Sequence, residues 1–282
     1  MNIQKLTHND VLEILPDRRA VSHKGDYGKV MLICGSEGYT GAAALAALGA
    51  LRSGCGLAYL LVPRSIYAIE ASKLLEPIVM PMPDHDGHIS VEAIENIAAI
   101  LSRMDAVLVG PGLGTSVDAE EIVRYILSKF EGPVVLDADG INVARKHKDI
   151  LRGRTCPTVI TPHEGEFLRF GGSLEYGRID GATKLANETG TIVVLKGHET
   201  VITDAECCYV NSTGNPGMAV GGSGDVLAGI IVSLIGQGIE PIRAAACGAW
   251  LHGAAGDICA DEVGQYGMLP SDMLQVIPRL MK

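Results

Sequence analysis

The chain has 282 residues, of which 47 % are hydrophobic and 20 % are charged, and its formal net charge is −10. This is the composition of a folded globular protein and excludes a disordered chain. The negative charge argues against nucleic acid and against an anionic membrane surface as partners, because both favour basic patches. Anionic small molecules are compatible with it, since they need only a local cluster of hydrogen-bond donors.

The first residues, MNIQKLTHNDVLEIL, lack the basic segment and apolar core of a secretory signal, so none is expected. No stretch approaches the roughly 18 uninterrupted apolar residues of a membrane-spanning helix. The seven cysteines include no CxxC pair, which is typical of reduced thiols and argues against a zinc site. The sequence therefore predicts a cytoplasmic protein that does not bind membranes.

Short runs of β-branched and apolar residues recur along the chain and predict buried strands. They are KVMLIC (29–34), LAYLLV (57–62), DAVLVG (105–110), PVVLDA (133–138), PTVITP (157–162) and TIVVLKG (191–197). A different pattern follows at residues 199–214, where two short runs flank Asp204 and Ala205 and predict an antiparallel hairpin at one sheet edge. Residues 80–88, MPMPDHDGH, form the most loop-like stretch.

Segments of helical period separate these strands. In residues 90–101 the apolar side chains fall on one face, and Ser90 is placed to cap the helix. Residues 115–127 carry acidic side chains in the first turn, and residues 244–260 form a helix of small residues suited to close packing. Strands that alternate with helices predict a mostly parallel sheet covered on both faces. No linker or repeat divides the chain, so residues 1–282 are expected to form a single domain.

The stretch GGSGD at residues 221–225 places bare backbone directly before a carboxylate and an apolar run. It is neither a P-loop, which needs GxxxxGK[ST], nor a dinucleotide fingerprint, which needs a third glycine where Leu227 stands. Convergent N–H groups and the dipole of a following helix favour an anion site. Asp225 would repel an anion there. It therefore either caps the helix or takes a proton from a hydroxyl that attacks a phosphoryl group.

The segment GNPGMAVGGSGDVLAG (214–229) resembles the signature of the ribokinase-like superfamily, and in particular that of its NAD(P)H-hydrate dehydratases. Similar motifs follow the family's order and spacing at residues 39–57, 109–114, 136–142, 161–167 and 194–200. The resemblance spans nearly the full length. It implies an α/β fold, namely a ribokinase-like three-layer α/β/α sandwich with a central mostly parallel sheet. Because the chain starts near the beginning of the dehydratase region, we expect it to lack the epimerase domain of fused members.

Enzymes of this family repair hydrated NADH and NADPH by phosphorylating the ring hydroxyl and then eliminating phosphate. The resemblance implies dehydration of the S-epimer of the hydrate, with ADP as co-substrate and with AMP, phosphate and NAD(P)H as products. It also implies Mg²⁺ as cofactor and a homo-oligomer, in particular a tetramer. Asp225 would be the catalytic base. The backbone amides that would stabilise charge on the transferring phosphoryl group belong to Gly222, Ser223 and Gly224.

The resemblance also assigns residues that bind ligands. The nucleotide would be held by Gly224 and by the loop of Lys196, Gly197, His198, Glu199 and Thr200, with a point charge from Lys196 and a hydroxyl from Thr200. The hydrated dinucleotide would contact Ala42, Gly112, Gly114, His163 and Asp225. Glu166 would position Mg²⁺ through water. Asp137, Asp139 and Asn142 suggest phosphate, magnesium or ribose contact, without a more specific role.

Several assignments have structural alternatives. Lys196 could be a strand-end lysine in solvent, and Gly112 and Gly114 could be plain turn residues. At the level of function, ATP could replace ADP, or the chain could be a kinase of a hydroxymethylpyrimidine or thiazole vitamin precursor, which shares the GSGD element. TPHEGEF (161–167) and KGHET (196–200) favour the dehydratase. The alternative from another class is a nucleotide-binding regulator without catalysis, and the intact Asp225 argues against it.

Overall fold

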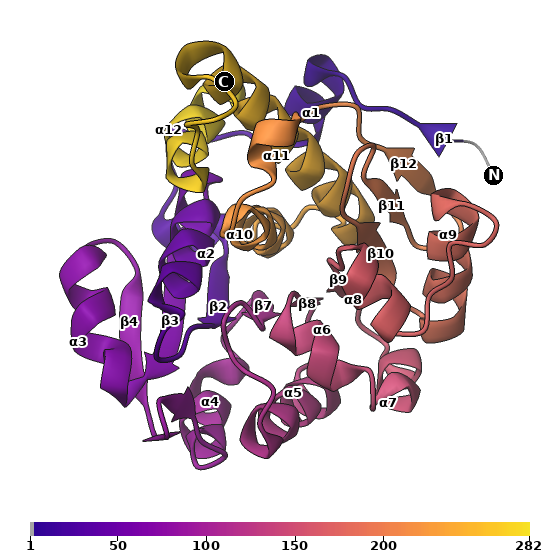
Figure 1. Ribbon diagram of the computed structural model, residues 1–282. Coiled ribbons are helices and arrows are strands. Elements are labelled where there is room, and N and C mark those ends of the chain that lie inside the picture. Colours follow the sequence, from indigo (N-terminus) through magenta and orange to yellow (C-terminus); the bar gives the residue numbers. More distant parts are fainter. Residues whose placement is uncertain (1–2) are drawn as a thin grey trace.

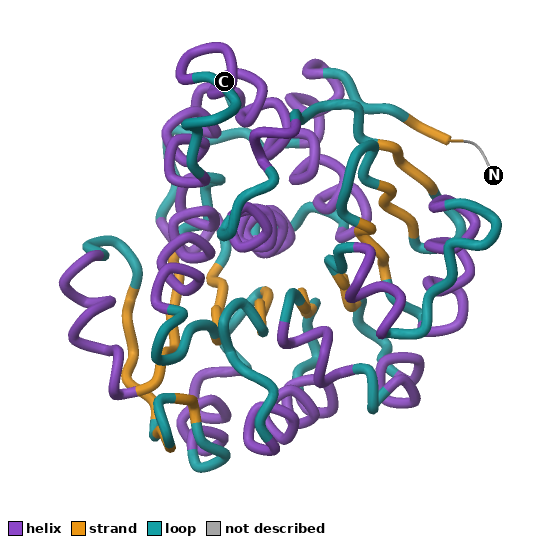
Figure 2. The backbone as a smooth tube through the Cα atoms, in the orientation of Figure 1, coloured by secondary structure: helices purple, strands orange, loops and turns teal. Residues whose placement is uncertain are grey.

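A central sheet organises the fold, and helices pack on both of its faces (Figures 1 and 2). The structure is a computed structural model that describes residues 3–282. The strands are β1 (Ile3–Gln4), β2 (Lys29–Ile33), β3 (Leu57–Pro63), β4 (Ile78–Met82), β5 (Asp84–His85), β6 (His88–Ile89), β7 (Ala106–Val109), β8 (Val134–Leu136), β9 (Thr158–Ile160), β10 (Ile192–Leu195), β11 (Val201–Thr203) and β12 (Cys208–Val210). The helices are α1 (His8–Ile14), η1 (Lys24–Tyr27), α2 (Thr40–Arg52), α3 (Arg64–Lys73), α4 (Ala93–Leu101), α5 (Val117–Lys129), α6 (Asp139–Ala144), α7 (Lys148–Gly153), α8 (Glu164–Arg169), α9 (Arg178–Thr189), η2 (Pro216–Met218), α10 (Ser223–Gly236), α11 (Pro241–Val263) and α12 (Pro270–Leu280).

The ten-stranded sheet has the order β1-β12-β11-β10-β9-β8-β7-β2-β3-β4, and β5 and β6 form a separate two-stranded hairpin. Neighbours are parallel from β4 through to β10, whereas β11 runs antiparallel to both β10 and β12. All six strands expected from the apolar runs are confirmed as β2, β3, β7, β8, β9 and β10. The hairpin expected around Asp204 and Ala205 is confirmed as β11 and β12, with β1 pairing outside it.

Alternate residues of each strand enter two separate cores. Val30 and Leu32 pack in the core on the side of α2, α10 and α11. Met31 and Ile33 pack in the core on the side of α4, α5 and α9. Strands buried on both faces read as continuous apolar runs, which is why the sequence revealed them. The predicted three-layer α/β/α sandwich is therefore confirmed.

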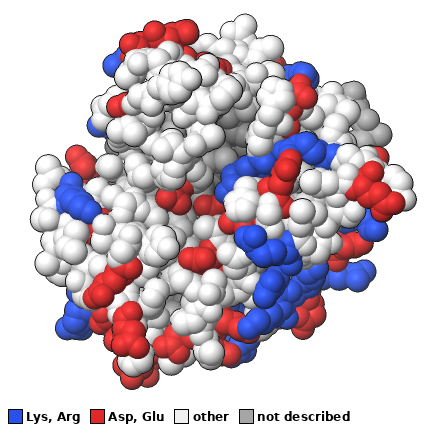
Figure 3. All heavy atoms as spheres, in the orientation of Figure 1, with Lys and Arg blue, Asp and Glu red and all other residues white. Residues whose placement is uncertain are grey.

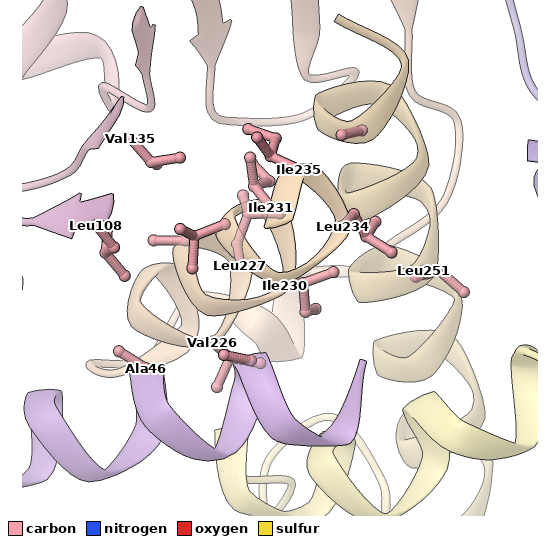
Figure 4. Close-up of a cluster of buried hydrophobic side chains, with 14 of the residues drawn as sticks. Ala46, Leu108, Val135, Val226, Leu227, Ile230, Ile231, Leu234, Ile235 and Leu251 are labelled. Carbon is pink, nitrogen blue, oxygen red and sulfur yellow. The ribbon is translucent and has the colours of Figure 1, made fainter. Parts of the chain in front are cut away.

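Helix α10 crosses the middle of one layer, and every residue from Val226 to Gly236 is buried. Its side chains reach toward the sheet at Leu108 and Val135, toward α2 at Ala46 and toward α11 at Leu251 (Figure 4). Two glycines let α2 and α10 touch through their backbones. A Cβ atom on Gly229 would overlap the Ala46 carbonyl, and one on Gly49 would lie 2.7 Å from the Val226 carbonyl oxygen.

Two local expectations are wrong. Helix α4 begins at Ala93 with Glu92 as its N-cap, and the Ser90 hydroxyl is buried without a hydrogen-bond partner among the described residues, so Ser90 is not the cap. Residues 80–88 are not simply a loop, because β4 extends to Met82 and the β5–β6 hairpin follows. β4 tolerates Pro81 because it is an edge strand, where a backbone position without an N–H group can face away from the neighbouring strand.

Within residues 3–282 the structure contains no helix of the length and apolarity needed to span a membrane. All seven cysteine thiols are free. Burial raises the pKa of Cys55 to about 11 and that of Cys247 to about 12, so these thiols are protonated and unreactive at neutral pH.

The close packing of α2 on α10 leads to a prediction about stability. Gly229→Ala should lower the free energy of unfolding by about 1–3 kcal/mol, because the added methyl group meets the backbone of α2. Urea unfolding measures the change. Gly153→Ala is the control, since nothing lies within 4 Å of its added methyl group, and it should be neutral or slightly stabilising. Equal effects in the two variants would contradict the close contact.

Candidate active site

The loops after β2, β7, β8, β9 and β10 meet at the edge of the sheet where α10 begins, the usual place for ligands in parallel sheets. Figure 3 shows this face hollowed near its middle, with acidic side chains beside the hollow. The site residues predicted from the sequence lie at or just after these strand ends or in the first turns of α2, α8 and α10. His198 and Glu199 lie farther along the loop after β10 and are exposed.

The start of α10 presents bare backbone. Gly222 is the N-cap, with a left-handed φ of +95° that favours glycine, and it forms no side-chain capping bond. The helix starts at Ser223, so Asp225 lies in its first turn rather than before it. Asp225 is therefore not the N-cap, and the capping alternative is not supported. The predicted amides of Gly222, Ser223 and Gly224 stand at this helix end, where the helix dipole favours an anion, and the Ser223 N–H donates to the Val220 carbonyl at 3.3 Å.

The carboxyl of Asp225 has a pKa shifted upward from its ordinary value. Burial and, to a smaller extent, the nearby Asp137 raise the pKa of its carboxyl to about 6, while Lys196 acts in the opposite direction. A carboxyl with this pKa is mostly ionised at neutral pH and still accepts a proton readily. The site therefore places a carboxylate that can accept a proton directly beside the N-terminus of a buried helix.

Lys196 forms an ion pair within the site. Its Nζ donates to Asp137 Oδ1 at 2.8 Å and lies 4.0 Å from Glu166 Oε2. Thr161 Oγ1 donates to the same Asp137 oxygen at 2.6 Å. Burial opposes the charge of Lys196, but Asp137, Glu166 and Asp225 together raise the pKa of its ammonium group. Because the side chain is only 20 % exposed, Lys196 is not a strand-end lysine in solvent.

The rest of the predicted nucleotide loop forms a tight turn. Thr200 Oγ1 donates to the Gly197 carbonyl at 3.0 Å, and His198 and Glu199 are exposed. Arg178 clamps the start of the turn, donating to the carbonyls of Leu195 at 2.8 Å and Lys196 at 3.0 Å. Sequence reasoning missed Arg178, because it comes from α9 and no motif surrounds it.

The predicted substrate turns also come together. A Cβ atom on Gly112 would lie 3.1 Å from Ala42 Cβ and 2.8 Å from Tyr39 Cβ, so these residues are in contact. Gly114 donates its N–H to Asp139 Oδ2 at 2.8 Å. His88, which sequence reasoning missed, packs over Gly114 from the β5–β6 hairpin.

His163 and Glu166 cap each other across the first turn of α8. His163 Nδ1 accepts from the Gly165 N–H at 3.0 Å, and the His163 N–H donates to Glu166 Oε2 at 2.9 Å. The His163 side chain is 55 % exposed, whereas Glu166 is buried. His163 thus combines a structural role with an open ring edge.

Asp137 and Asp139 serve different parts of the site. Asp137 pairs with Lys196, and Asp139 binds the Gly114 turn. Between them Ala138 adopts φ +47° and ψ −115°, a strained conformation for a residue with a Cβ. Such strain is typical of functional sites, and here it directs two neighbouring carboxylates to separate partners.

His252 is another residue that the sequence did not reveal. Its Nε2 lies 3.3 Å from the Ser223 hydroxyl, and burial lowers the pKa of its imidazole to about 4. A neutral histidine therefore lies directly behind the start of α10. Within residues 3–282 no group of three or more His, Cys, Asp or Glu side chains is arranged to hold a metal ion by itself.

Solved structures share this architecture. A Bacillus subtilis protein described as an ADP/ATP-dependent NAD(P)H-hydrate dehydratase, co-crystallized with ATP and Mg²⁺, superposes with a TM-score of 0.85 at 32 % identity over 99 % of this chain and 98 % of that one. A ribokinase-like superfamily protein from Enterococcus faecalis superposes with a TM-score of 0.87 at 28 % identity over 99 % and 95 %. The fold and the site together define a ribokinase-like α/β protein.

Sequence comparison narrows this class. The profile of the NAD(P)H-hydrate dehydratase family matches residues 30–279, and the chain belongs to that family. A bifunctional NAD(P)H-hydrate repair enzyme from Moorella thermoacetica is 42 % identical over 275 residues, covering 95 % of this chain and 52 % of that protein. An ADP-dependent (S)-NAD(P)H-hydrate dehydratase from Bacillus subtilis is 34 % identical over 293 residues, covering 100 % and 99 %. The chain thus spans about half the length of the bifunctional relatives that it matches.

The ion pair predicts a coupling between two substitutions. Asp137→Ala should lower the free energy of unfolding by about 3 kcal/mol, since it strands a buried ammonium group. The double variant Asp137→Ala/Lys196→Met should lose at least about 1 kcal/mol less unfolding free energy than the losses of the two single variants added together. Urea unfolding of the four proteins gives this coupling energy.

The exposed pair of Glu262 and Arg279, 3.8 Å apart, is the control and should show a coupling below about 0.5 kcal/mol. Additive losses at Asp137 and Lys196 would mean that the two side chains do not stabilise each other.

Proposed function

We propose that residues 1–282 act as one catalytic domain that dehydrates the S-epimer of hydrated NADH or NADPH, with ADP converted to AMP and phosphate. The observation that carries the proposal is Asp225, a base with a pKa of about 6 at the bare start of α10. The names of the relatives, an ADP-dependent dehydratase among them, support the substrate and the donor.

The chemistry follows from leaving-group ability. Hydroxide leaves a ring carbon poorly, whereas phosphate leaves well. Asp225 accepts the proton of the ring hydroxyl as its oxygen attacks the terminal phosphorus of ADP, and AMP departs. The N–H groups at the start of α10 stabilise the charge on the transferring group. The lone pair of the ring nitrogen then expels phosphate, and loss of a proton from the next ring carbon restores the dihydropyridine.

The donor phosphates would lie between the start of α10 and the loop of Lys196 to Thr200. Lys196 supports this placement, because a Cβ on Gly224 would lie only 3.2 Å from its Nζ. Glu166 would hold Mg²⁺ through water with its Oε1, because its Oε2 already accepts the His163 N–H at 2.9 Å, and a carboxylate oxygen is a ligand type that this ion favours. When bound, Mg²⁺ would neutralise charge on the donor phosphates.

The hydrated nicotinamide ring would lie against Ala42, Gly112, Gly114 and the open edge of His163. Gly112 and Ala42 are in contact and carry no side chain larger than a methyl group, which suits close approach of a flat ring. The side chain of Tyr39 borders Gly112, and that of His88 borders Gly114. We further infer a cytoplasmic location, in keeping with seven free thiols, and a homotetramer. The small residues of α11 contact α10 and residues 213–218 of the same chain, so the tetramer is proposed from resemblance alone.

The proposal predicts the products of a turnover assay. With hydrated NADH, ADP and Mg²⁺, the protein should release AMP and phosphate in equal amounts and form NADH, and chelation of the metal should abolish the reaction. Chromatography with mass spectrometry measures all three products. A product that keeps the transferred phosphoryl group, without release of inorganic phosphate, would indicate a kinase of the same fold instead. Turnover with ATP alone would contradict the assignment of ADP as donor.

The pKa of Asp225 predicts a pH dependence. As a base Asp225 acts when deprotonated, so kcat/KM should rise about tenfold per pH unit up to about pH 6 and then level off. Asp225→Asn should reduce kcat at least about a hundredfold while nucleotide binding is retained. Steady-state kinetics between about pH 5 and 8, with calorimetry for ADP, tests both. An Asp225→Asn protein with the parent kcat would remove Asp225 from the mechanism.

A further inference from the structure

A basic groove lies beside the site, in a protein whose net charge is −10. It has a volume of about 420 Å³ and is lined by Thr115, Asn142, Val143, Arg145, Lys146 and Arg169. Thr115 follows the turn after β7, residues 142–146 belong to or follow α6, and Arg169 ends α8. The groove therefore opens at the same edge of the sheet as the site. Lysine and arginine side chains gather over α6, α7 and α8 in Figure 3.

Two of its cations have no carboxylate partner within residues 3–282. Arg145 forms no ion pair there, and Arg169 only donates from Nε to Asn142 Oδ1 at 3.4 Å. Lys146, by contrast, is neutralised by Glu120, and Arg178 nearby is neutralised by Glu164. Two uncompensated guanidinium groups facing one groove favour an anion, and their planar forks match phosphate oxygens.

The groove continues directly from the substrate turns. A Cβ atom on Gly165 would lie 2.9 Å from the His163 ring and 3.3 Å from Arg169 Nη1, so Arg169 stands beside His163. Asn142 follows Asp139 by one helical turn, and Asp139 holds the Gly114 turn. Within residues 3–282 no hydrogen bond or ion pair joins either arginine to the loop of Lys196 to Thr200, whose first carbonyls are bound by Arg178.

We propose that Arg145 and Arg169 bind the phosphate groups of the dinucleotide substrate, and not those of the phosphoryl donor. This inference rests on the proposed function for the identity of the substrate. The dinucleotide carries a diphosphate bridge in both forms and a further 2′-phosphate in hydrated NADPH. The groove would hold one of these while the nicotinamide ring reaches Asp225.

Steady-state kinetics tests the proposal with Arg145→Gln, Arg169→Gln and the double variant. The KM for the hydrated dinucleotide should rise about tenfold for each arginine, the usual scale for a lost charge-assisted hydrogen bond, with kcat and the KM for ADP unchanged. An equal rise for both substrates assigns the groove to the diphosphate, and a rise confined to hydrated NADPH assigns it to the 2′-phosphate. Arg243→Gln is the control, because Arg243 is exposed on α11 and this substitution changes the net charge by the same amount as each groove variant.

A binding measurement separates this proposal from the proposed function. Calorimetry with ADP-ribose and its 2′-phosphate should show weaker binding in the double variant than in the parent, and no weakening in Arg243→Gln. That result would support the phosphate groove even if hydrated NADH were not turned over. Parent-like affinity and parent-like KM values in the double variant would overturn it, as would losses that Arg243→Gln reproduces. A matching loss of ADP affinity would assign the groove to the donor instead, and would also overturn it.

Discussion

One buried cation holds the site together. Lys196 lies among Asp137, Glu166 and Asp225, three carboxylates that would repel one another in a partly buried pocket. Asp137 accepts hydrogen bonds from both Lys196 and Thr161, and the ammonium group acts to lower the pKa of Asp225, which burial raises to about 6. One lysine thus pairs directly with Asp137 while it acts on Asp225 through charge alone. Removing it would raise the pKa of Asp225 further and leave Asp137 without its ion-pair partner.

The apolar packing of α10 gives this electrostatic arrangement a rigid support. The helix is buried from Val226 onward and contacts α2 through bare backbone, so its start cannot shift without opening the core. On the opposite side of the site the chain is strained at Ala138, and a Cβ on Gly110 would overlap the Asp137 carbonyl. Close packing on one side and a tight turn on the other fix the distance between Asp225 and the Lys196–Asp137 pair.

The sequence was informative where a local pattern determines structure. Doubly buried strands are continuous apolar runs, and the hairpin around Asp204 has its own turn residues, so both were predictable. The glycines before Asp225 also form a local pattern, and they marked the start of α10. The inward position of Lys196, the separate partners of Asp137 and Asp139, and the burial of His252 depend on contacts between distant segments. Ser90 looked like a cap because its type suits one, yet the chain turns once more before α4 begins. The catalytic and binding roles of the predicted site residues stay predictions, from Asp225 and the amides before it to the Lys196 loop, Ala42, Gly112, Gly114, His163 and Glu166.

Helix α10 is held at both ends. Its last residue, Gly236, packs against Gly28, whose missing side chain leaves room for the Gly236 carbonyl. The helix therefore works as a spacer of fixed length, about 21 Å for its 14 residues, set between a stop at the far side of the sheet and the reacting groups. Loss or gain of one residue within it would rotate Asp225 by about 100° relative to that stop. Related proteins should therefore have an α10 of the same length, or one that differs by whole helical turns. The loop before Gly222 can vary in length without rotating Asp225.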